Sequence, residues 1–194
     1  MAWRVLQSFS PSYHPRLLPL PERRIPDINW MKTGAAIDAG ILPKTLKVLS
    51  GAKKLHAFIP ALACGPFVAS DEFRSLVETL EPGLHQFVPV EIVYKDGRVS
   101  DLPYFLVNIM QVLNPIRIEN SKVDWVALPN PHHPGALFQS PGPFKLTLNK
   151  SVIAGKHFWR ERLFSYGVFF SDELMERCNA LKLRGLSADV VLET

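Results

Sequence analysis

The sequence predicts an α+β fold: a single domain with a mainly antiparallel sheet and two or three helices packed on it. Segments rich in β-branched and aromatic residues follow one another with hairpin-like turns between them. Only two segments show a strong helical periodicity. The 194 residues, 47% of them hydrophobic, are enough to build one hydrophobic core. We therefore treat residues 1–194 as one domain, with an N-terminal arm and mixed region over 1–54.

The two predicted helices begin with the same three letters, Ser-Asp-Glu. Ser70 and Ser171 are expected to act as N-caps, and the acidic residues after them suit the positive end of the helix dipole. Each helix then has an apolar stripe at helical spacing. The stripes consist of Phe73, Leu76, Val77 and Leu80 in the first helix, and of Leu174, Met175, Cys178 and Leu181 in the second. Because the sequences downstream differ, we interpret the repeat as one local folding solution used twice, and not as a duplication.

The strand predictions depend on apolar runs bounded by turn residues. Two such runs flank Asp96-Gly97 and predict a hairpin with a connection longer than two residues. Further strands are expected at 3–8, 116–120, 123–128, 144–149, 157–171 and 188–193. The segment 44–51 fits either the start of a helix or a strand. Prolines between 11 and 26 prevent a helix there, and residues 129–143, with five prolines and two glycines, are expected to form a loop.

Charge and cysteine content narrow the class of protein. The formal net charge is +4, but the basic residues are scattered, which is typical of a solvated face and makes nucleic-acid binding an unfavoured interpretation. Cys64 and Cys178 stand in apolar stretches outside any metal-binding spacing, as buried thiols of a reducing compartment do. The chain has no uninterrupted apolar run that resembles a secretion signal or a membrane span. These features predict a cytoplasmic protein without membrane contact.

The sequence contains none of the common catalytic motifs: no nucleophile elbow, phosphate-binding loop, dinucleotide-binding glycine pattern or zinc-protease helix. His132 and His133 are adjacent, but no third ligand stands at a useful spacing, so a plain loop is favoured over a metal site. Cys178 lies on a predicted buried stripe, where thiols are unreactive. We predict that the protein is not an enzyme and has no catalytic residue, cofactor or metal.

The segment 156–162, KHFWRER, is the one place where basic and aromatic residues alternate. This composition fits stacking on single-stranded nucleic acid. It also fits a protein interface, in which Trp and Arg contribute much of the binding energy. The third interpretation, a half-buried strand with outward arginines, is the favoured one of the three.

Five short segments occur in a fixed order along the chain: Ser70–Arg74, Phe87–Val90, Tyr104–Asn108, Glu119–Ser121 and Phe170–Leu186. None is specific alone, but the succession resembles a family of bacterial immunity proteins of polymorphic toxin systems. The resemblance covers about residues 55–192, apart from 129–143, and does not include the N-terminal arm. It implies that the protein binds a cognate toxin domain and neutralises it during interbacterial competition, by occluding the toxin's active site or substrate path without turnover.

The motifs behind this resemblance are fold determinants, so the toxin-binding surface has to be sought in exposed residues around apolar anchors. The candidates are Tyr13, Arg16, His132, His133, Leu137, Phe138, Trp159, Arg160 and Arg162. The positive net charge suits an acidic toxin. Two alternatives remain open, an enzyme that uses the His132-His133 loop and a weak nucleic-acid-binding module. The sequence gives no indication of the oligomeric state.

Overall fold

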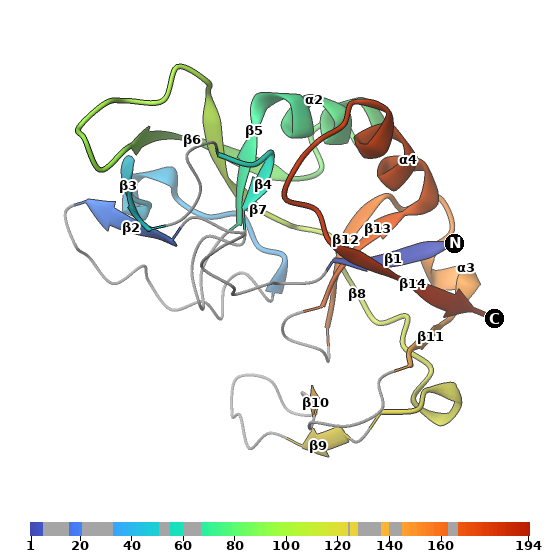
Figure 1. The fold of residues 1–194 in the computed structure, drawn as a ribbon. Helices are drawn as coiled ribbons and strands as arrows, with labels where there is room; N and C mark the ends of the chain where they lie inside the picture. Colours follow the sequence, from blue (N-terminus) through green and yellow to red (C-terminus); the bar gives the residue numbers. More distant parts are fainter. Residues whose placement is uncertain are drawn as a thin grey trace.

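The structure, a computed structural model, describes residues 1–5, 16–20, 33–50, 55–59, 67–123, 125–127, 137–139, 145–162 and 167–194. These residues form one α+β domain with two six-stranded sheets, which confirms the predicted fold class (Figure 1). Most neighbouring strands are antiparallel. The sheets are nevertheless mixed, because β3 pairs in parallel with β6, β11 with β14, and β8 with β12.

The first sheet has the strand order β11-β14-β1-β13-β12-β8. Its strands are β1 (Ala2–Val5), β8 (Val112–Leu113), β11 (Thr147–Leu148), β12 (Phe158–Glu161), β13 (Val168–Ser171) and β14 (Ala188–Glu193). The N-terminal strand β1 lies between β13 and β14 and is antiparallel to both. Residues from the two ends of the sequence therefore form the middle of this sheet.

The second sheet has the order β2-β3-β6-β7-β5-β4. Its strands are β2 (Arg16–Leu20), β3 (Thr45–Ser50), β4 (Phe58–Ile59), β5 (Phe67–Ser70), β6 (Gln86–Val93) and β7 (Tyr104–Asn108). The predicted hairpin is confirmed, since β6 and β7 pair from Gln86↔Asn108 to Val90↔Tyr104. Two short strands, β9 (Trp125–Ala127) and β10 (Leu137–Gln139), form a separate antiparallel pair.

Both Ser-Asp-Glu segments turn a strand directly into a helix. Strand β5 leads into α2 (Asp71–Leu80), and β13 leads into α4 (Asp172–Ala180). The hydroxyl of Ser70 accepts a hydrogen bond from Phe73 N at 3.5 Å, and that of Ser171 accepts one from Leu174 N at 3.1 Å. Both predicted N-caps are thus confirmed. The remaining described helices are short: α3 (Lys150–Ile153) and the 3₁₀ turns η1 (Ala39–Ile41) and η2 (Ile118–Asn120).

One hydrophobic core joins the two sheets beneath α2 and α4, which lie side by side (Figure 1). Phe73 of α2 contacts Phe158 of β12 and Phe170 of β13, with ring centroids 5.6 and 5.5 Å apart. Cys178, on the inner side of α4, is fully buried as predicted. A second cluster covers the other face of the second sheet, and a third lies between the first sheet and α3. The shared central core makes the two sheets one folding unit.

Four predicted details are wrong. Residues 137–139, inside the predicted loop 129–143, form β10, which pairs with β9. The segment 157–171 forms two strands, β12 and β13, which pair as a hairpin. Residues 118–120 form η2 and not a strand, because the Ser121 hydroxyl donates to Arg117 O at 2.7 Å and closes a tight turn. Leu181 is 55% exposed although it continues the buried stripe of α4, since the helix ends at Ala180 and the chain turns there.

Candidate functional site

The structure places the predicted toxin-contacting residues in different environments. Tyr13, His132 and His133 lie outside the described residues. Arg16 belongs to β2, and Leu137 and Phe138 belong to β10, but only their backbone is described. Arg162 follows β12 and is exposed, as the prediction requires. For these residues, contact with a toxin stays a prediction.

Trp159 and Arg160 are buried, with only 1% and 7% of their surface exposed, so the expectation that both are exposed is wrong. Strand β12 lies between β13 and β8, and all four of its residues are buried. The indole of Trp159 stacks on Phe169 with a centroid distance of 5.8 Å. The Arg160 guanidinium lies over the ring of Phe67 at 5.1 Å, and burial lowers its pKa to about 10. In this fold, both side chains are packed in the interior and are not exposed to a partner.

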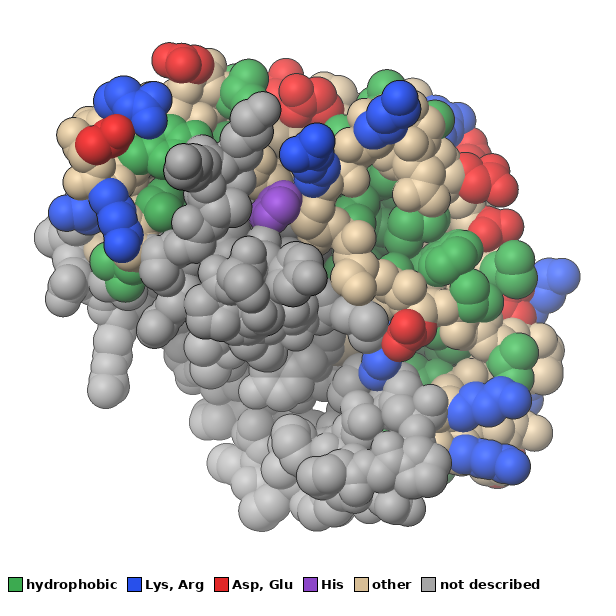
Figure 2. Space-filling view, viewed as in Figure 1, with side chains coloured by type: hydrophobic (Ala, Val, Ile, Leu, Met, Phe, Trp, Pro, Cys, Tyr) green, Lys and Arg blue, Asp and Glu red, His purple; other side chains and the backbone are tan. Residues whose placement is uncertain are grey.

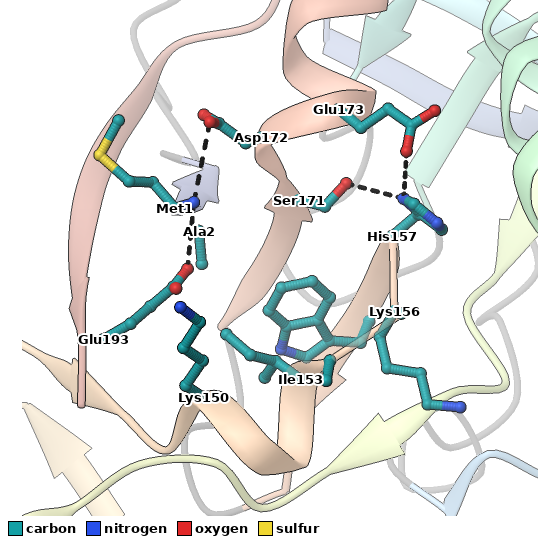
Figure 3. Close-up of a pocket in the computed structure, with 13 residues that line it drawn as sticks. Met1, Ala2, Lys150, Ile153, Lys156, His157, Ser171, Asp172, Glu173 and Glu193 are labelled. Carbon is teal, nitrogen blue, oxygen red and sulfur yellow. Dashed lines mark hydrogen bonds and ion pairs between the residues drawn. The ribbon is translucent and has the colours of Figure 1, made fainter.

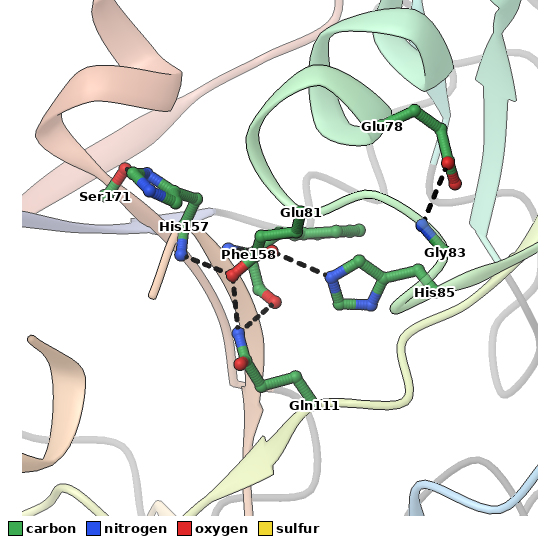
Figure 4. A network of polar contacts seen from close by, with 8 residues as sticks. All are labelled: Glu78, Glu81, Gly83, His85, Gln111, His157, Phe158 and Ser171. Atoms are coloured by element: carbon green, nitrogen blue, oxygen red, sulfur yellow. Dashed lines mark hydrogen bonds and ion pairs between the residues drawn. The ribbon is translucent and has the colours of Figure 1, made fainter. Parts of the chain in front are cut away.

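A buried carboxylate connects the end of α2 to β12 (Figure 4). Glu81 Oε1 accepts hydrogen bonds from the Gln111 amide at 2.9 Å and from His157 N at 2.8 Å. Its Oε2 accepts one from Phe158 N at 3.1 Å and lies 2.9 Å from His85 Nε2. Because an ionised carboxylate only accepts, His85 Nε2 is the donor in that contact. One carboxylate therefore satisfies four donors from three separate segments.

Burial alone would raise the pKa of Glu81. The hydrogen bonds from His85, from the His157 backbone and from Gln111 outweigh burial and hold the pKa below its usual value. The carboxylate is thus ionised and fully engaged, and it is enclosed with only 7% of the residue exposed. A group in this state joins α2 to the first sheet, and it is not available to a substrate.

A pocket of about 210 Å³ lies at the start of α4, lined by both ends of the described chain and by α3 (Figure 3). His157 Nδ1 is 2.9 Å from Ser171 Oγ and 3.9 Å from Glu173 Oε2. A serine, a histidine and an acid therefore meet here. In a nucleophilic triad, however, the serine and the acid contact opposite nitrogens of the ring. Here both contact Nδ1, and Ser171 also caps α4, so the arrangement is that of a helix cap.

Large apolar side chains are exposed at several places on the described surface, and in two of these places they lie close together in the sequence (Figure 2). One is β14, where Val190 and Leu192 are 51% and 48% exposed; Leu181, which follows α4, is 55% exposed. The other is the β6–β7 loop, which we define as residues 94–103. In this loop Val99 is 48% and Leu102 is 55% exposed, with charged side chains of both signs around them. Exposed apolar side chains that lie close together are the kind of feature that contacts a partner, whereas single ones are common on any protein surface.

The β6–β7 loop has a dense set of internal contacts. Tyr94 N donates to Arg98 O at 2.8 Å, and Gly97, with a φ of +86°, donates to Tyr94 O at 3.0 Å. Asp96 accepts from Arg98 Nε at 2.9 Å and from Arg98 N at 3.1 Å. The Arg98 guanidinium also lies 5.2 Å from the centre of the Tyr94 ring. The loop is therefore fixed by its own residues.

Sequence reasoning did not select this loop, because it treated Asp96-Gly97 only as a turn. The composition carries a local signal, since the apolar residues Val99 and Leu102 stand in a segment of turn-forming and charged residues. The Glu81 network gave no such signal. Glu81, Gln111 and His157 are far apart in the sequence, and no motif connects them.

Comparisons with known proteins indicate the family to which the chain belongs. A search of curated proteins gives no match. Within the described residues, no group of three or more His, Cys, Asp or Glu side chains could hold a metal ion. Among the helices described, none has the length and apolar composition of a membrane span. A family model described as "Immunity protein family (Imm11)" matches residues 18–192, which is most of the chain and includes part of the N-terminal region. This match confirms the resemblance noted in the sequence, and the chain belongs to the Imm11 immunity protein family.

Proposed function

We propose that this protein binds a cognate toxin protein in the cytoplasm and neutralises it by covering the toxin's active site or its substrate path. No bond is made or broken in this mechanism, and the protein is not consumed. The match of the Imm11 family model over residues 18–192 carries the proposal. The pocket at α4 supports it further, because His157 and Ser171 are arranged as a helix cap and not as a catalytic pair.

Inhibition by occlusion needs a rigid surface more than a reactive one. The central core holds both sheets and both long helices together, so the described strands form one packed support for the surface residues on them. A partner then binds without first ordering the fold, which lowers the entropic cost of association. This rigidity is what an inhibitor that works by shape requires.

We expect the gene immediately upstream of this one to encode the cognate toxin domain, and the experiment uses that domain. Expression of that domain alone in a susceptible bacterium is expected to stop growth, and co-expression with this protein is expected to restore it. The purified proteins should form a stoichiometric complex on size-exclusion chromatography. Restored growth without a complex would contradict occlusion, since it would point to an enzymatic or indirect effect.

The charge of the toxin is part of the same proposal. The net charge of +4 favours association with a toxin that has an acidic face. If so, the association rate should fall as the salt concentration rises from 50 to 500 mM, because mobile ions screen the attraction between exposed charges. Tight, salt-sensitive binding to a strongly basic toxin domain would refute this part alone and leave occlusion standing.

A further inference from the structure

We propose that the β6–β7 loop, residues 94–103, is the element that enters the toxin, and that it occupies a concave, largely apolar cleft there. This inference rests on the proposed function and adds to it the surface that inhibits and the kind of surface that receives it. Four features of the loop lead to the proposal: its shape, its exposed apolar pair, its internal order and its charge.

The loop is convex. Regular pairing of β6 with β7 ends at Val90↔Tyr104, and a single bridge between Val93 and Val99 continues beyond it. The chain between these strands extends past the body of the second sheet and projects from it (Figure 1). Substrate sites of enzymes are concave and mostly apolar. A projecting loop can enter such a site, whereas a strand within a sheet, such as β14, can only cover its rim.

The loop presents two apolar side chains that its own fold leaves uncovered. Val99 is 48% and Leu102 is 55% exposed, three positions apart at the end of a hairpin. The Ser100 hydroxyl accepts from Leu102 N at 3.3 Å and lies 3.2 Å from Leu102 O, which fixes the backbone between them. Transfer of both side chains into an apolar cleft would remove them from water, which is the main favourable term in association.

The loop is also ordered before any partner arrives. Arg98 bonds to Asp96 and packs on Tyr94, and Ser100 N donates to Ile92 O at 2.8 Å, which secures the loop to the end of β6. A loop that already has its bound shape loses little conformational entropy on binding.

The charges in the loop cancel. Lys95 and Arg98 are balanced by Asp96 and Asp101, so the loop has no net charge. Long-range attraction between the two proteins must then come from the rest of the surface and act on the association rate. Apolar contacts made by the loop after encounter act on the dissociation rate instead. Loop variants are therefore expected to change dissociation and leave the salt dependence of association intact.

The test measures binding kinetics to the toxin domain encoded by the upstream gene, by biolayer interferometry. The loop variant is Val99→Asn with Leu102→Asn, which removes both apolar side chains without adding charge. The chain offers a closely matched control, Val190→Asn with Leu181→Asn, in which the leucines are each 55% exposed and the valines are 48% and 51% exposed. We expect the loop variant to bind at least tenfold more weakly through faster dissociation, and the control to stay within twofold of the wild type.

The outcomes separate this inference from the proposed function. If the wild type fails to bind the toxin domain, the proposed function is wrong. If the wild type and the loop variant bind equally well, the proposed function stands and the loop assignment is refuted. If only the control loses affinity, the surface that contains Leu181 and β14 is the interface.

A second measurement uses the unmodified protein and so does not depend on a variant that folds. Hydrogen exchange of the wild type, alone and with the toxin domain, is expected to show slower exchange at residues 94–103 in the complex. Unchanged exchange in this loop, together with slower exchange in β14, would overturn the proposal. Thermal unfolding of both double variants shows in parallel whether either substitution has altered the fold.

Discussion

Replacement of Glu81 by glutamine is expected to destabilise the fold by about 3 kcal/mol at pH 7, because the amide cannot satisfy the four donors that the carboxylate satisfies. If the amide nitrogen takes the place of Oε1, it faces the Gln111 and His157 donors. If it takes the place of Oε2, Phe158 N loses its acceptor, and His85 Nε2 can accept from the amide only in the tautomer that carries its proton on Nδ1. The second arrangement leaves the Phe158 N–H and the His85 Nδ1–H buried and unpaired. It also weakens the two hydrogen bonds to Oε1, which are no longer charge-assisted.

The stabilisation that Glu81 provides should depend on pH in a definite direction. The pKa of Glu81 is lowered in the folded protein, so the unfolded chain binds more protons at acid pH. The stabilisation by Glu81 is complete above the unfolded pKa of about 4.3, and it is lost as the pH falls through the lower folded pKa. The difference between wild type and Glu81→Gln should therefore be largest at neutral pH and should shrink below about pH 4.

Urea unfolding, followed by tryptophan fluorescence at pH 7 and at pH 3.5, measures both free energies. The matched control is Glu176→Gln, at an exposed position of α4, which we expect to change the free energy of unfolding by less than about 0.5 kcal/mol. A Glu81→Gln protein as stable as the control would refute the role of the network. A loss of the same size at both pH values would refute the assignment of an ionised carboxylate.

Three further predictions concern the helices and the core. Ser171→Ala should lower the free energy of unfolding, measured in urea, by about 1 kcal/mol, because the α4 cap is lost. The control Ser75→Ala, at an exposed position inside α2, should not change this free energy measurably. Equal effects of the two substitutions would contradict the role of Ser171 as a cap. In a Cys64→Ser background, Cys178 should resist a thiol reagent at pH 8 and react only in urea, because burial raises the pKa of its thiol to about 12; rapid labelling of the native protein would show that α4 opens. Arg160→Met should leave the midpoint of thermal unfolding unchanged or raise it, because a buried cation is replaced by an apolar side chain of similar length; a fall of more than about 10 °C would show that the charge itself stabilises the core.

The parts of the fold that sequence reasoning predicted are those controlled by neighbours in the chain. Each of these parts depends on residues within about ten positions on either side of its centre. They are the caps at Ser70 and Ser171, the apolar stripe of α2 and the hairpin around Asp96-Gly97. Leu181 shows the limit of this reasoning, because its spacing matches the stripe of α4 but the chain turns before it reaches the core. Spacing predicts which face a residue occupies only while the helix continues.

The site was harder to predict because exposure depends on distant strands. Trp159 and Arg160 have the composition of an interface, and only the presence of β13 and β8 on either side of β12 buries them. The opposite holds for Val99 and Leu102, whose composition suits a core strand and which the hairpin leaves in solvent. For Trp159 and Arg160 the deciding neighbours are far away in the sequence, and no local pattern indicates them.

The position of β1 has a consequence for biosynthesis. Residues 2–5 leave the ribosome long before their partners in β13 and β14 are translated. The first sheet therefore cannot close until β13 and β14 have left the ribosome, so β1 cannot complete its pairing early in synthesis. A chain interrupted before residue 188 would leave β1 with an open side. The core beneath α2 and α4 therefore closes only after translation has passed β14.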